Sequence, residues 1–413
     1  MYNTNMLKGT INLKGDKSIS HRVLIFAAMA KGQSSIINLS ACDDVKRTMD
    51  ILEKCNIKII KSNHQININS TKVKSNAKTF DCGNSGTTAR LMLGFLPANG
   101  ITGTLYGDES LSQRPMSRVS KPLQELGINI SNNKTLPISF KKSHPKNINY
   151  TLKVPSAQVK TSLILAALMS DKKSIIVDPF KTRDHTERIL KYLGHHDKQF
   201  YKFKFKGFQY NVPGDISNAS FIITAAALIP NSDIKIKNIL YNKTRIGYIN
   251  ILKKMGVKIK TSNHRSEFYE EVCDIEVKYS TNIKNINLNN EDVVSMIDEI
   301  PIFALLATQA KGTLIIKGAN ELRIKESDRI KAIVYNLKQF NADINELDDG
   351  IRIKGPKRLY SASIKTFSDH RIAMTMAIAA IIAEKKFVIN KDIELLSCTS
   401  FPEFYHLIKL LYV

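Results

Sequence analysis

An apolar segment, a short polar turn and a β-rich segment follow one another six times along the 413-residue chain. The first copy reads VLIFAAMAKGQSSIINL and the last reads IAMTMAIAAIIAEKKFVIN. Each apolar segment is hydrophobic nearly all round, which predicts a buried helix rather than a surface helix. A second, amphipathic helix is expected after each strand, for example over DDVKRTMDILEKCNIKI, because its hydrophobic residues recur at helical spacing. The repeats therefore predict an α/β chain of six units, each strand–helix–strand–helix–strand–strand.

The number of copies also predicts how the chain divides. Copies begin about 60 to 80 residues apart, which is too long for a solenoid repeat, and together they exceed one ordinary domain. We therefore expect two similar lobes of three units each. Pro213 and Gly214 punctuate the midpoint, and the glycine after residue 14 is a comparable break. This division places residues 1–14 and 213–413 in one lobe and residues 15–212 in the other.

The chain is strongly basic, with 61 Lys and Arg against 37 Asp and Glu, a net charge of +24. A balance of this sign favours anionic partners. Much of the charge lies in stretches such as KIIKSNHQININSTKVKSNAK, which read as exposed strand faces and turns. We therefore interpret most of it as solvated surface and expect no nucleic-acid partner.

The cysteines and the hydrophobic runs indicate the compartment. The five cysteines are widely spaced and form no CxxC motif, which argues against a disulfide framework or a zinc site. The first residues, MYNTNMLKGTINLKG, lack a hydrophobic signal region, and no uninterrupted apolar run reaches about 18 residues. We expect a protein of the cytoplasm with no membrane partner.

Charged and polar residues gather in the turns that lead into the buried helices. The first turn, GDKSISHR, places Lys17 and Arg22 at the start of a helix. The positive end of the helix dipole disfavours cations there unless an anion lies between them. The other turns read CGNSGTTAR, VPSAQVKT, VPGDISNAS, SMIDEIP and FSDHR. If the units pack with pseudo-symmetry, the helix N-termini converge and form, with Arg90 and Arg371, an anion-binding site between the lobes.

Several polar residues of these turns have a simpler interpretation as helix caps. They are Asp16, Ser18, Asn84, Ser156, Asp215, Asp298 and Asp369. Capping explains the acids and the serines but not the cations. Two further basic segments, GDESLSQRPM and ELRIKESDRI, lie outside the turns. In the second, acids and bases alternate too densely for capping and helical charge pairs alone.

The motif content restricts the chemistry. The chain contains no GxxxxGK[ST], HExxH or GxSxG motif, and no cysteine has a recognisable nucleophile setting. Covalent and metal chemistry therefore lack support, and we expect neither a metal nor a cofactor. What remains is a site rich in Arg and Lys with isolated carboxylates at Asp298, Glu299 and Glu326. That combination predicts proton transfer on a small, multiply anionic substrate.

At these residues the chain resembles the 5-enolpyruvylshikimate-3-phosphate (EPSP) synthase family. The segments that carry the resemblance are KGDKSISHR, GNSGTTARL, SLSQRPM, PSAQVKTSLILAAL, RDHTER, RIKESDR and DHRIAM. They span the chain in order and resemble the branch of the family with SAQVK and DHTER. The resemblance implies two lobes, each of three βαβαββ units, that close over a ligand cleft. This architecture agrees with the six copies counted above.

The resemblance also implies a reaction. The enolpyruvyl (1-carboxyvinyl) group of phosphoenolpyruvate (PEP) would pass to the 5-hydroxyl of shikimate 3-phosphate, with release of phosphate, in chorismate and aromatic amino acid biosynthesis. Each substrate carries a carboxylate and a phosphate, so both are anions of the predicted kind. We expect these small molecules as the partners of a monomeric enzyme. In this family the inhibitor glyphosate competes with PEP.

The resemblance assigns roles to particular residues. Those for shikimate 3-phosphate are Lys17, Ser18, Arg22, Ser156, Ala157, Gln158, Arg183, Asp298 and Lys325. Those for PEP are Lys17, Gly86, Arg114, Gln158, Arg329 and Arg371. The catalytic residues would be Asp298 as base towards the 5-hydroxyl, Glu326 as the acid that protonates the PEP methylene, and Lys17, which touches both substrates.

Two departures from the family and two alternatives remain. The stretch CTSFPEF lacks the lysine that some members carry before TFP, and Ala157 is serine in many members, which leaves the phosphate pocket one hydroxyl short. UDP-N-acetylglucosamine enolpyruvyl transferase is the related alternative, but GDKSISHR lacks its Lys–Asn pair and GDESLSQRP lacks its loop cysteine. A basic nucleic-acid-binding protein is the other, although only YKFKFKGF interleaves aromatic and basic residues.

Overall fold

The chain forms two compact units in its computed structural model. The residues that the structure describes are 6–62, 65–70, 72–384 and 391–413. The first unit comprises Met1–Leu13, Pro213–Ser266 and Glu271–Val413, and the second comprises Lys14–Val212 and Glu267–Glu270. The division expected from the sequence did not include the transfer of Glu267–Glu270 to the second unit.

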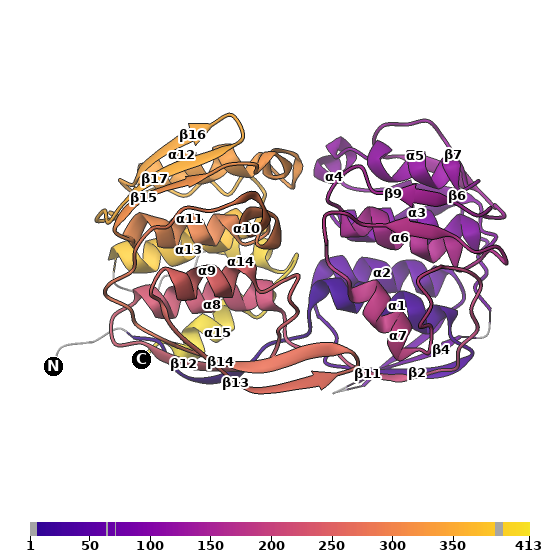
Figure 1. Cartoon of the computed structure of the whole chain (residues 1–413), viewed down its shortest axis with the longest axis horizontal. Coiled ribbons are helices and arrows are strands. Elements are labelled where there is room, and N and C mark those ends of the chain that lie inside the picture. The colour runs from indigo at the N-terminus through magenta and orange to yellow at the C-terminus, as the bar shows by residue number, and fades with distance from the viewer. Residues whose placement is uncertain (1–5, 63–64, 71, 385–390) are drawn as a thin grey trace. The chain divides into compact units, whose positions relative to one another are not determined.

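Three buried helices form the centre of the second unit. They are α1 (Lys17–Met29), α3 (Gly86–Ala98) and α6 (Ala157–Ala167). Helix α3 packs against both of the others (Figure 1). Every residue of α1 from Ile19 to Ala28 is buried, as expected for a helix that is apolar on most sides.

Amphipathic helices and sheets surround this centre. The amphipathic helices are α2 (Asp43–Lys54), α5 (Ser117–Glu125) and α7 (His185–Tyr192), each in contact with at least one buried helix. The strands of the first sheet, in spatial order, are β11 (Gln209–Asn211), β2 (Gly32–Ile37), β4 (Gln65–Ser70) and β3 (Lys58–Lys61). The second sheet contains β5 (Thr79–Asp81), β6 (Gly103–Tyr106), β8 (Ile138–Lys141) and β7 (Asn129–Ile130). A parallel pair joins β9 (Asn149–Thr151) and β10 (Ile175–Val177).

The first unit repeats this plan. Its buried helices α8 (Ile216–Leu228), α11 (Ile300–Gln309) and α13 (His370–Glu384) all contact one another (Figure 1). Its amphipathic helices are α9 (Gly247–Lys254), α12 (Arg329–Gln339) and α15 (Phe404–Leu411). One sheet orders β1 (Lys8–Asn12), β12 (Asp233–Leu240), β14 (Glu270–Lys278) and β13 (Lys258–Glu267). Another orders β15 (Gly312–Ile316), β17 (Gly350–Gly355) and β16 (Asp343–Leu347).

The sheets show the internal repetition directly. In each four-stranded sheet of the described residues a parallel pair comes first and an antiparallel pairing follows it. In the first unit, for example, β1 runs parallel to β12, and β12 runs antiparallel to β14. A parallel neighbour requires a crossover connection, whereas an antiparallel neighbour can follow through a short turn. The strands of the β5–β6–β8–β7 sheet come from one consecutive unit, whereas the parallel edge strands β1 and β11 come from distant parts of the chain.

The α/β class and the six buried helices predicted from the repeats are confirmed. Several short helices were not predicted, because a segment of about one or two turns shows too few periods to be recognised. They are α4 (Glu109–Gln113), η1 (Asn320–Ile324), α10 (Asn290–Ser295) and α14 (Lys391–Ser397). No helix in the described part of the chain is both long and apolar enough to cross a membrane.

Candidate active site

The N-terminus of α1 carries a basic cluster. Asp16 caps the helix, because its Oδ1 accepts a hydrogen bond of 2.9 Å from the amide of Ile19. Arg22 is only 2% exposed, and its Nε and Nη2 donate to the hydroxyls of Thr186 and Thr161, each at 2.9 Å. A buried guanidinium at the positive end of a helix is a strong attractor for an anion.

Two further cations complete this cluster. Lys17 Nζ donates to Asp44 Oδ2 at 2.8 Å, and Arg183 Nη1 donates to Ser18 Oγ at 3.2 Å. We call Lys17, Ser18, Arg22 and Arg183 the α1 cluster. The structure therefore brings four of the sequence-predicted residues together in the second unit, although Arg183 lies far from the others in sequence.

A histidine beside the α1 cluster, His21, stays neutral. His21 is fully buried, and its Nδ1 lies 2.7 Å from the hydroxyl of Thr48. Burial, followed by the charges of Lys17 and Arg22, holds the pKa of His21 well below its ordinary value. The positive charge of the cluster at neutral pH therefore comes from Lys17, Arg22 and Arg183.

A second basic cluster lies at the N-terminus of α3. Arg114 is buried, and its guanidinium donates to the backbone and side-chain oxygens of Asn84 at 3.1 and 2.6 Å. Arg90 Nη1 donates to Gln158 Oε1 at 2.7 Å. A Cβ added to Gly86 would lie 2.9 Å from Arg90 Nη1 and 3.5 Å from Arg114 Nη1. We call Gly86, Arg90, Arg114 and Gln158 the α3 cluster.

The caps near this cluster partly differ from the sequence prediction. Ser85, not Asn84, caps α3, by accepting from the amide of Thr88 at 3.1 Å. The Asn84 side chain instead contacts Arg114 and Asp108. Ser156 does cap α6, and Ala157 is the first residue of that helix. The sequence-predicted residues Ser156, Ala157 and Gln158 thus lie together at the start of α6.

The acidic candidates belong to the first unit, where they surround one buried arginine. Arg329 is 1% exposed, its Nε donates to Asp369 Oδ2 at 2.8 Å, and its Nη2 donates to Glu326 Oε2 at 2.6 Å. Its Nη1 lies 3.7 Å from Asp298 Oδ1, and Lys325 Nζ lies 3.3 Å from the same oxygen. Arg371 Nη1 donates to the carbonyl of Asp298 at 2.7 Å.

We call Asp298, Lys325, Glu326, Arg329 and Arg371 the α12 cluster. Burial acts to lower the pKa of Arg329, but Asp369, Glu326 and Asp298 outweigh it and hold that pKa above its usual value. Burial likewise acts to raise the pKa of Asp369, and Arg329 reverses that shift. The buried Arg329–Asp369 pair is therefore ionised, and the carboxylates of Asp298 and Glu326 lie beside Arg329.

Asp298 does not occupy the N-cap position of α11 (Ile300–Gln309). It precedes α11, but Glu299 occupies the N-cap position and makes no capping hydrogen bond. Glu299 is instead buried between Ser217, which donates to it, and Arg371, whose Nη1 lies 3.9 Å away. The prediction of a cap at Asp298 is wrong, whereas Asp215 caps α8 and Asp369 accepts from the amide of Arg371.

Sequence reasoning missed several contacts that hold these clusters. Asp44 binds Lys17, and Asp369 binds Arg329. The hydroxyl of Ser217 donates to Glu299 and accepts from Arg245 Nη2 at 2.8 Å. Asp369 and Ser217 lie in the turns FSDHR and VPGDISNAS, which the sequence had singled out. Nothing in the sequence indicates which cation each acid would meet.

The cysteines are unsuited to nucleophilic catalysis. All five are free, and Cys42, Cys55, Cys82 and Cys273 are buried. Burial raises the pKa of Cys42 to about 11 and that of Cys55 to about 12, so their reactive thiolate forms are scarce at neutral pH. Within the described ranges, no group of three or more His, Cys, Asp or Glu could hold a metal ion.

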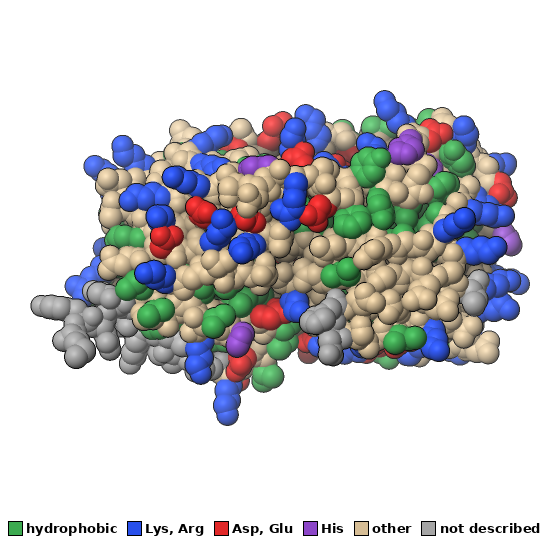
Figure 2. All heavy atoms as spheres, turned by 90° about the horizontal axis from the view of Figure 1, so that it is seen from below, with side chains coloured by type: hydrophobic (Ala, Val, Ile, Leu, Met, Phe, Trp, Pro, Cys, Tyr) green, Lys and Arg blue, Asp and Glu red, His purple; other side chains and the backbone are tan. Residues whose placement is uncertain are grey.

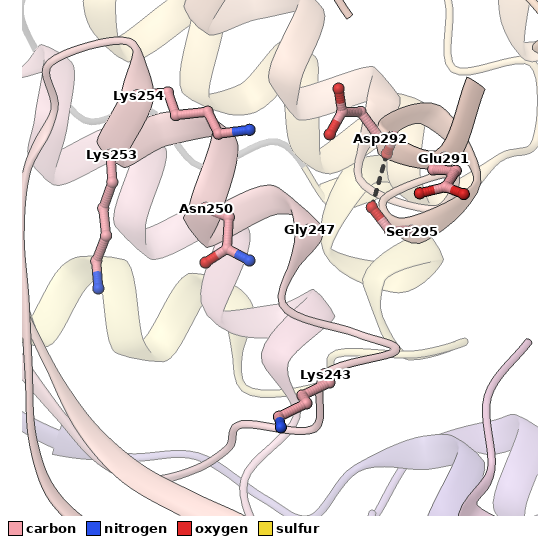
Figure 3. Close-up of a pocket in the computed structure, with 8 residues that line it drawn as sticks. All are labelled: Lys243, Gly247, Asn250, Lys253, Lys254, Glu291, Asp292 and Ser295. Carbon is pink, nitrogen blue, oxygen red and sulfur yellow. Dashed lines mark hydrogen bonds between the residues drawn. The ribbon is translucent and has the colours of Figure 1, made fainter. Parts of the chain in front are cut away.

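A hollow of about 400 Å³, which no residue of the three clusters lines, lies beside α9 and α10 (Figure 3). It is lined by Lys243, Gly247, Asn250, Lys253, Lys254, Glu291, Asp292 and Ser295. Asp292 forms a capping box with Asn289 at the start of α10, and its carbonyl accepts from Ser295 Oγ at 2.8 Å. These polar groups serve the local helix, and no sequence-predicted site residue lines the hollow.

Comparison with known proteins gives one consistent result. The family described as EPSP synthase (3-phosphoshikimate 1-carboxyvinyltransferase) matches residues 1–408. The 3-phosphoshikimate 1-carboxyvinyltransferase of Persephonella marina is 40% identical over 97% of this chain and 96% of its own length. That of Geobacillus thermodenitrificans is 41% identical over 92% of each.

Solved structures agree with this match. The EPSP synthase of Acinetobacter baumannii superimposes with a TM-score of 0.85 at 33% identity, covering 99% of this chain and 96% of its own. The enolpyruvyl transferase NikO from Streptomyces tendae has a TM-score of 0.76 at 13% identity, covering 98% of this chain and 95% of its own. The second likeness is one of fold alone.

Proposed function

The chain belongs to the EPSP synthase family, and we propose that the α1, α3 and α12 clusters bind and convert the two substrates of its reaction. The protein is a transferase, a 3-phosphoshikimate 1-carboxyvinyltransferase. It transfers the enolpyruvyl group of PEP to the 5-hydroxyl of shikimate 3-phosphate and releases phosphate, a step of aromatic amino acid biosynthesis. The match of the family over residues 1–408 is the observation that carries this conclusion.

The α1 cluster would bind shikimate 3-phosphate. Arg22 and Arg183 offer guanidinium groups, and Ser18 and Ser156 offer hydroxyls, at the starts of α1 and α6. Phosphate oxygens accept strong, charge-assisted hydrogen bonds from such donors. We further propose that Arg183, which contacts Ser18, compensates for the hydroxyl missing at Ala157.

The α3 cluster would bind the phosphate of PEP. Gly86 leaves room beside the guanidinium groups of Arg90 and Arg114, and the amides at the start of α3 add further donors. Gln158 would contact both substrates. Arg329 and Arg371 would bind the PEP carboxylate, Lys17 would contact both substrates, and Lys325 would contact shikimate 3-phosphate beside Asp298.

The two carboxylates of the α12 cluster would move the protons. Asp298 would accept the proton of the 5-hydroxyl while the hydroxyl oxygen attacks C2 of PEP. Glu326 would donate a proton to the PEP methylene. The resulting tetrahedral intermediate would lose a proton from the new methyl group together with phosphate, which restores the double bond and gives the enol ether. Lys325 and Arg329, near Asp298, would stabilise the negative charge that develops during these steps.

The alternatives are not favoured. The close relatives carry the name of the shikimate enzyme rather than that of the UDP-N-acetylglucosamine enzyme. Figure 2 shows Lys and Arg side chains scattered among acidic and apolar ones over one face, rather than gathered into a continuous basic patch. We further propose that the protein acts in the cytoplasm, which its lack of disulfides supports, and that it is a monomer.

Phosphate release from PEP in the presence of shikimate 3-phosphate tests this function. We expect turnover with shikimate 3-phosphate, none with UDP-N-acetylglucosamine, and a product heavier than shikimate 3-phosphate by one enolpyruvyl group in mass spectrometry. Asp298→Asn should abolish most turnover, whereas Asp348→Asn, the same change at an exposed site, should not. Phosphate release that does not require shikimate 3-phosphate would contradict the proposal.

A further inference from the structure

The hairpin of β13 and β14 has an unusual turn. Its strands belong to the sheet of the first unit, but its tip, Glu267–Glu270, belongs to the second unit. The two turn residues, Phe268 and Tyr269, have φ angles of 52° and 64°. Both lie in the left-handed region, where such turns normally use Asn or Gly because a bulky side chain is strained there. The geometry of the turn therefore does not explain why Phe268 and Tyr269 occupy it.

Contacts of the tip with other residues of the second unit explain Phe268 and Tyr269. The ring of Phe268 stacks on Tyr210 with a centroid distance of 4.7 Å and meets the edge of Tyr192 at 5.1 Å. The carbonyl of Tyr269 accepts from Arg188 Nη1 at 2.6 Å. Aromatic packing and a charge-assisted hydrogen bond both offset the strain of the turn.

The tip also inserts a carboxylate into the second unit. Glu270 Oε1 lies 2.7 Å from His185 Nδ1, and both side chains are fully buried. Glu270 Oε2 lies 3.8 Å from Arg188 Nε. Since a carboxylate only accepts hydrogen bonds, His185 must carry its proton on Nδ1. The two oxygens of Glu270 thus face two different donors, both at the N-terminal end of α7.

The residues on either side of His185 reach the α1 cluster. Thr186 Oγ1 accepts from Arg22 Nε at 2.9 Å, and Arg183 Nη1 donates to Ser18 Oγ at 3.2 Å. Lys160 holds the same segment from the side of α6, because its Nζ binds Glu187 Oε1 at 2.7 Å. The start of α7 is therefore fixed between the hairpin tip and the residues assigned to shikimate 3-phosphate.

We propose that Glu270 is a positioning residue for shikimate 3-phosphate, acting through His185 on Arg183 and on the Thr186–Arg22 pair. The proposal rests on the function proposed above. Glu270 touches no reacting group; it sets the place of the cations that hold the phosphate end of this substrate. A small displacement of a binding group from its productive position is enough to weaken binding strongly.

Glu270→Gln tests the proposal with little change of shape. The amide offers one acceptor in place of two, so it cannot serve both His185 and Arg188. We expect the KM for shikimate 3-phosphate to rise about tenfold and the KM for PEP to stay within about twofold. Glu271→Gln, the same change one residue along and in the first unit, is the matched control and should leave both constants unchanged.

A double-mutant cycle separates positioning from a general loss of stability. If Glu270 acts through Arg183, then Glu270→Gln in an Arg183→Ala background should raise the KM for shikimate 3-phosphate by a factor of less than about two. Calorimetric titration provides a second readout. Glu270→Gln should weaken binding of shikimate 3-phosphate more than binding of shikimate, which lacks the phosphate.

Arg188→Gln provides a second test if Glu270→Gln fails to fold. Arg188 is partly exposed and donates a hydrogen bond to the carbonyl of Tyr269 in the tip. The Arg188→Gln variant should produce the same one-sided rise in KM. An unchanged KM for shikimate 3-phosphate, an equal rise for both substrates, or additive effects with Arg183→Ala would overturn the proposal. A wild-type protein that binds shikimate 3-phosphate without turnover would contradict the proposed function instead, and the titrations would still decide the role of Glu270.

Discussion

Replacing Gly86 by alanine should weaken inhibition by glyphosate more than it weakens the use of PEP. The new Cβ would lie 2.9 Å from Arg90 Nη1, closer than a carbon normally approaches, so the guanidinium must move. The clashing atom is the end of a flexible side chain, and the protein should therefore still fold. The Arg90 guanidinium is also held by Gln158 at 2.7 Å, so its movement disturbs the pocket proposed for PEP.

The size of the effect follows from the cost of overpacking a tight site, about 1–3 kcal/mol. Such a cost corresponds to a roughly ten- to a hundredfold higher inhibition constant for glyphosate. Glyphosate is slightly longer than PEP, so the KM for PEP should rise less than the inhibition constant.

Steady-state phosphate release at varied PEP and glyphosate measures both constants. Arg90→Lys removes the clashing Nη1, so Gly86→Ala should raise the inhibition constant less in that background than in the wild type. Thermal unfolding of each variant controls for misfolding. Equal inhibition constants for wild type and Gly86→Ala would refute the assignment of this turn to PEP.

Three further outcomes are expected. Asp298→Ala should remove more than about nine-tenths of turnover while substrate dissociation constants stay within about tenfold, since a proton acceptor acts mainly in the transition state; calorimetry and single-turnover kinetics measure the two. Ala157→Ser should lower the KM for shikimate 3-phosphate a few-fold, by about the worth of one hydrogen bond, and an unchanged KM would show that Ala157 lies outside the phosphate pocket. Burial acts to raise the pKa of Asp178, but Thr182 and Lys160 hold it below the usual value. The ionised Asp178 therefore stabilises the folded state above its unfolded pKa of about 3.9. This stabilisation is lost as the pH falls through the lower pKa of the folded state. Asp178→Asn should therefore flatten the fall in unfolding free energy on the acid side of about pH 4, and an unchanged slope in denaturant titrations would contradict this.

The sequence predicted the fold well because each repeat carries its own local signal. Helices such as α1 and α8 are apolar on nearly every face, and that pattern is visible in any single copy. The charged turns drew attention to Lys17 and Asp298, whereas Gly86 and the roles of all three residues were assigned by the family resemblance. Local patterns therefore carried the prediction of the fold, and the resemblance carried that of the site.

What the sequence could not predict depends on long-range contacts. Ser85 and Asn84 are both good caps, and only the position of Arg114 decides that Asn84 contacts it and leaves the cap to its neighbour. Glu270 reads as one acid in the pair EE on an exposed hairpin, yet it is fully buried against His185, 85 residues earlier. No spacing rule connects such residues, because the tertiary fold brings them together.

The way the two units share the chain has a consequence for its synthesis. Strand β1 is made first but pairs with β12, more than 220 residues later, and the second unit lacks Glu270 until the hairpin has left the ribosome. A nascent chain that ends near residue 212 would therefore contain His185 without its buried partner. Neither unit is one contiguous stretch of the chain. Recombination that exchanges the second unit between relatives would therefore have to exchange Glu267–Glu270 together with Lys14–Val212.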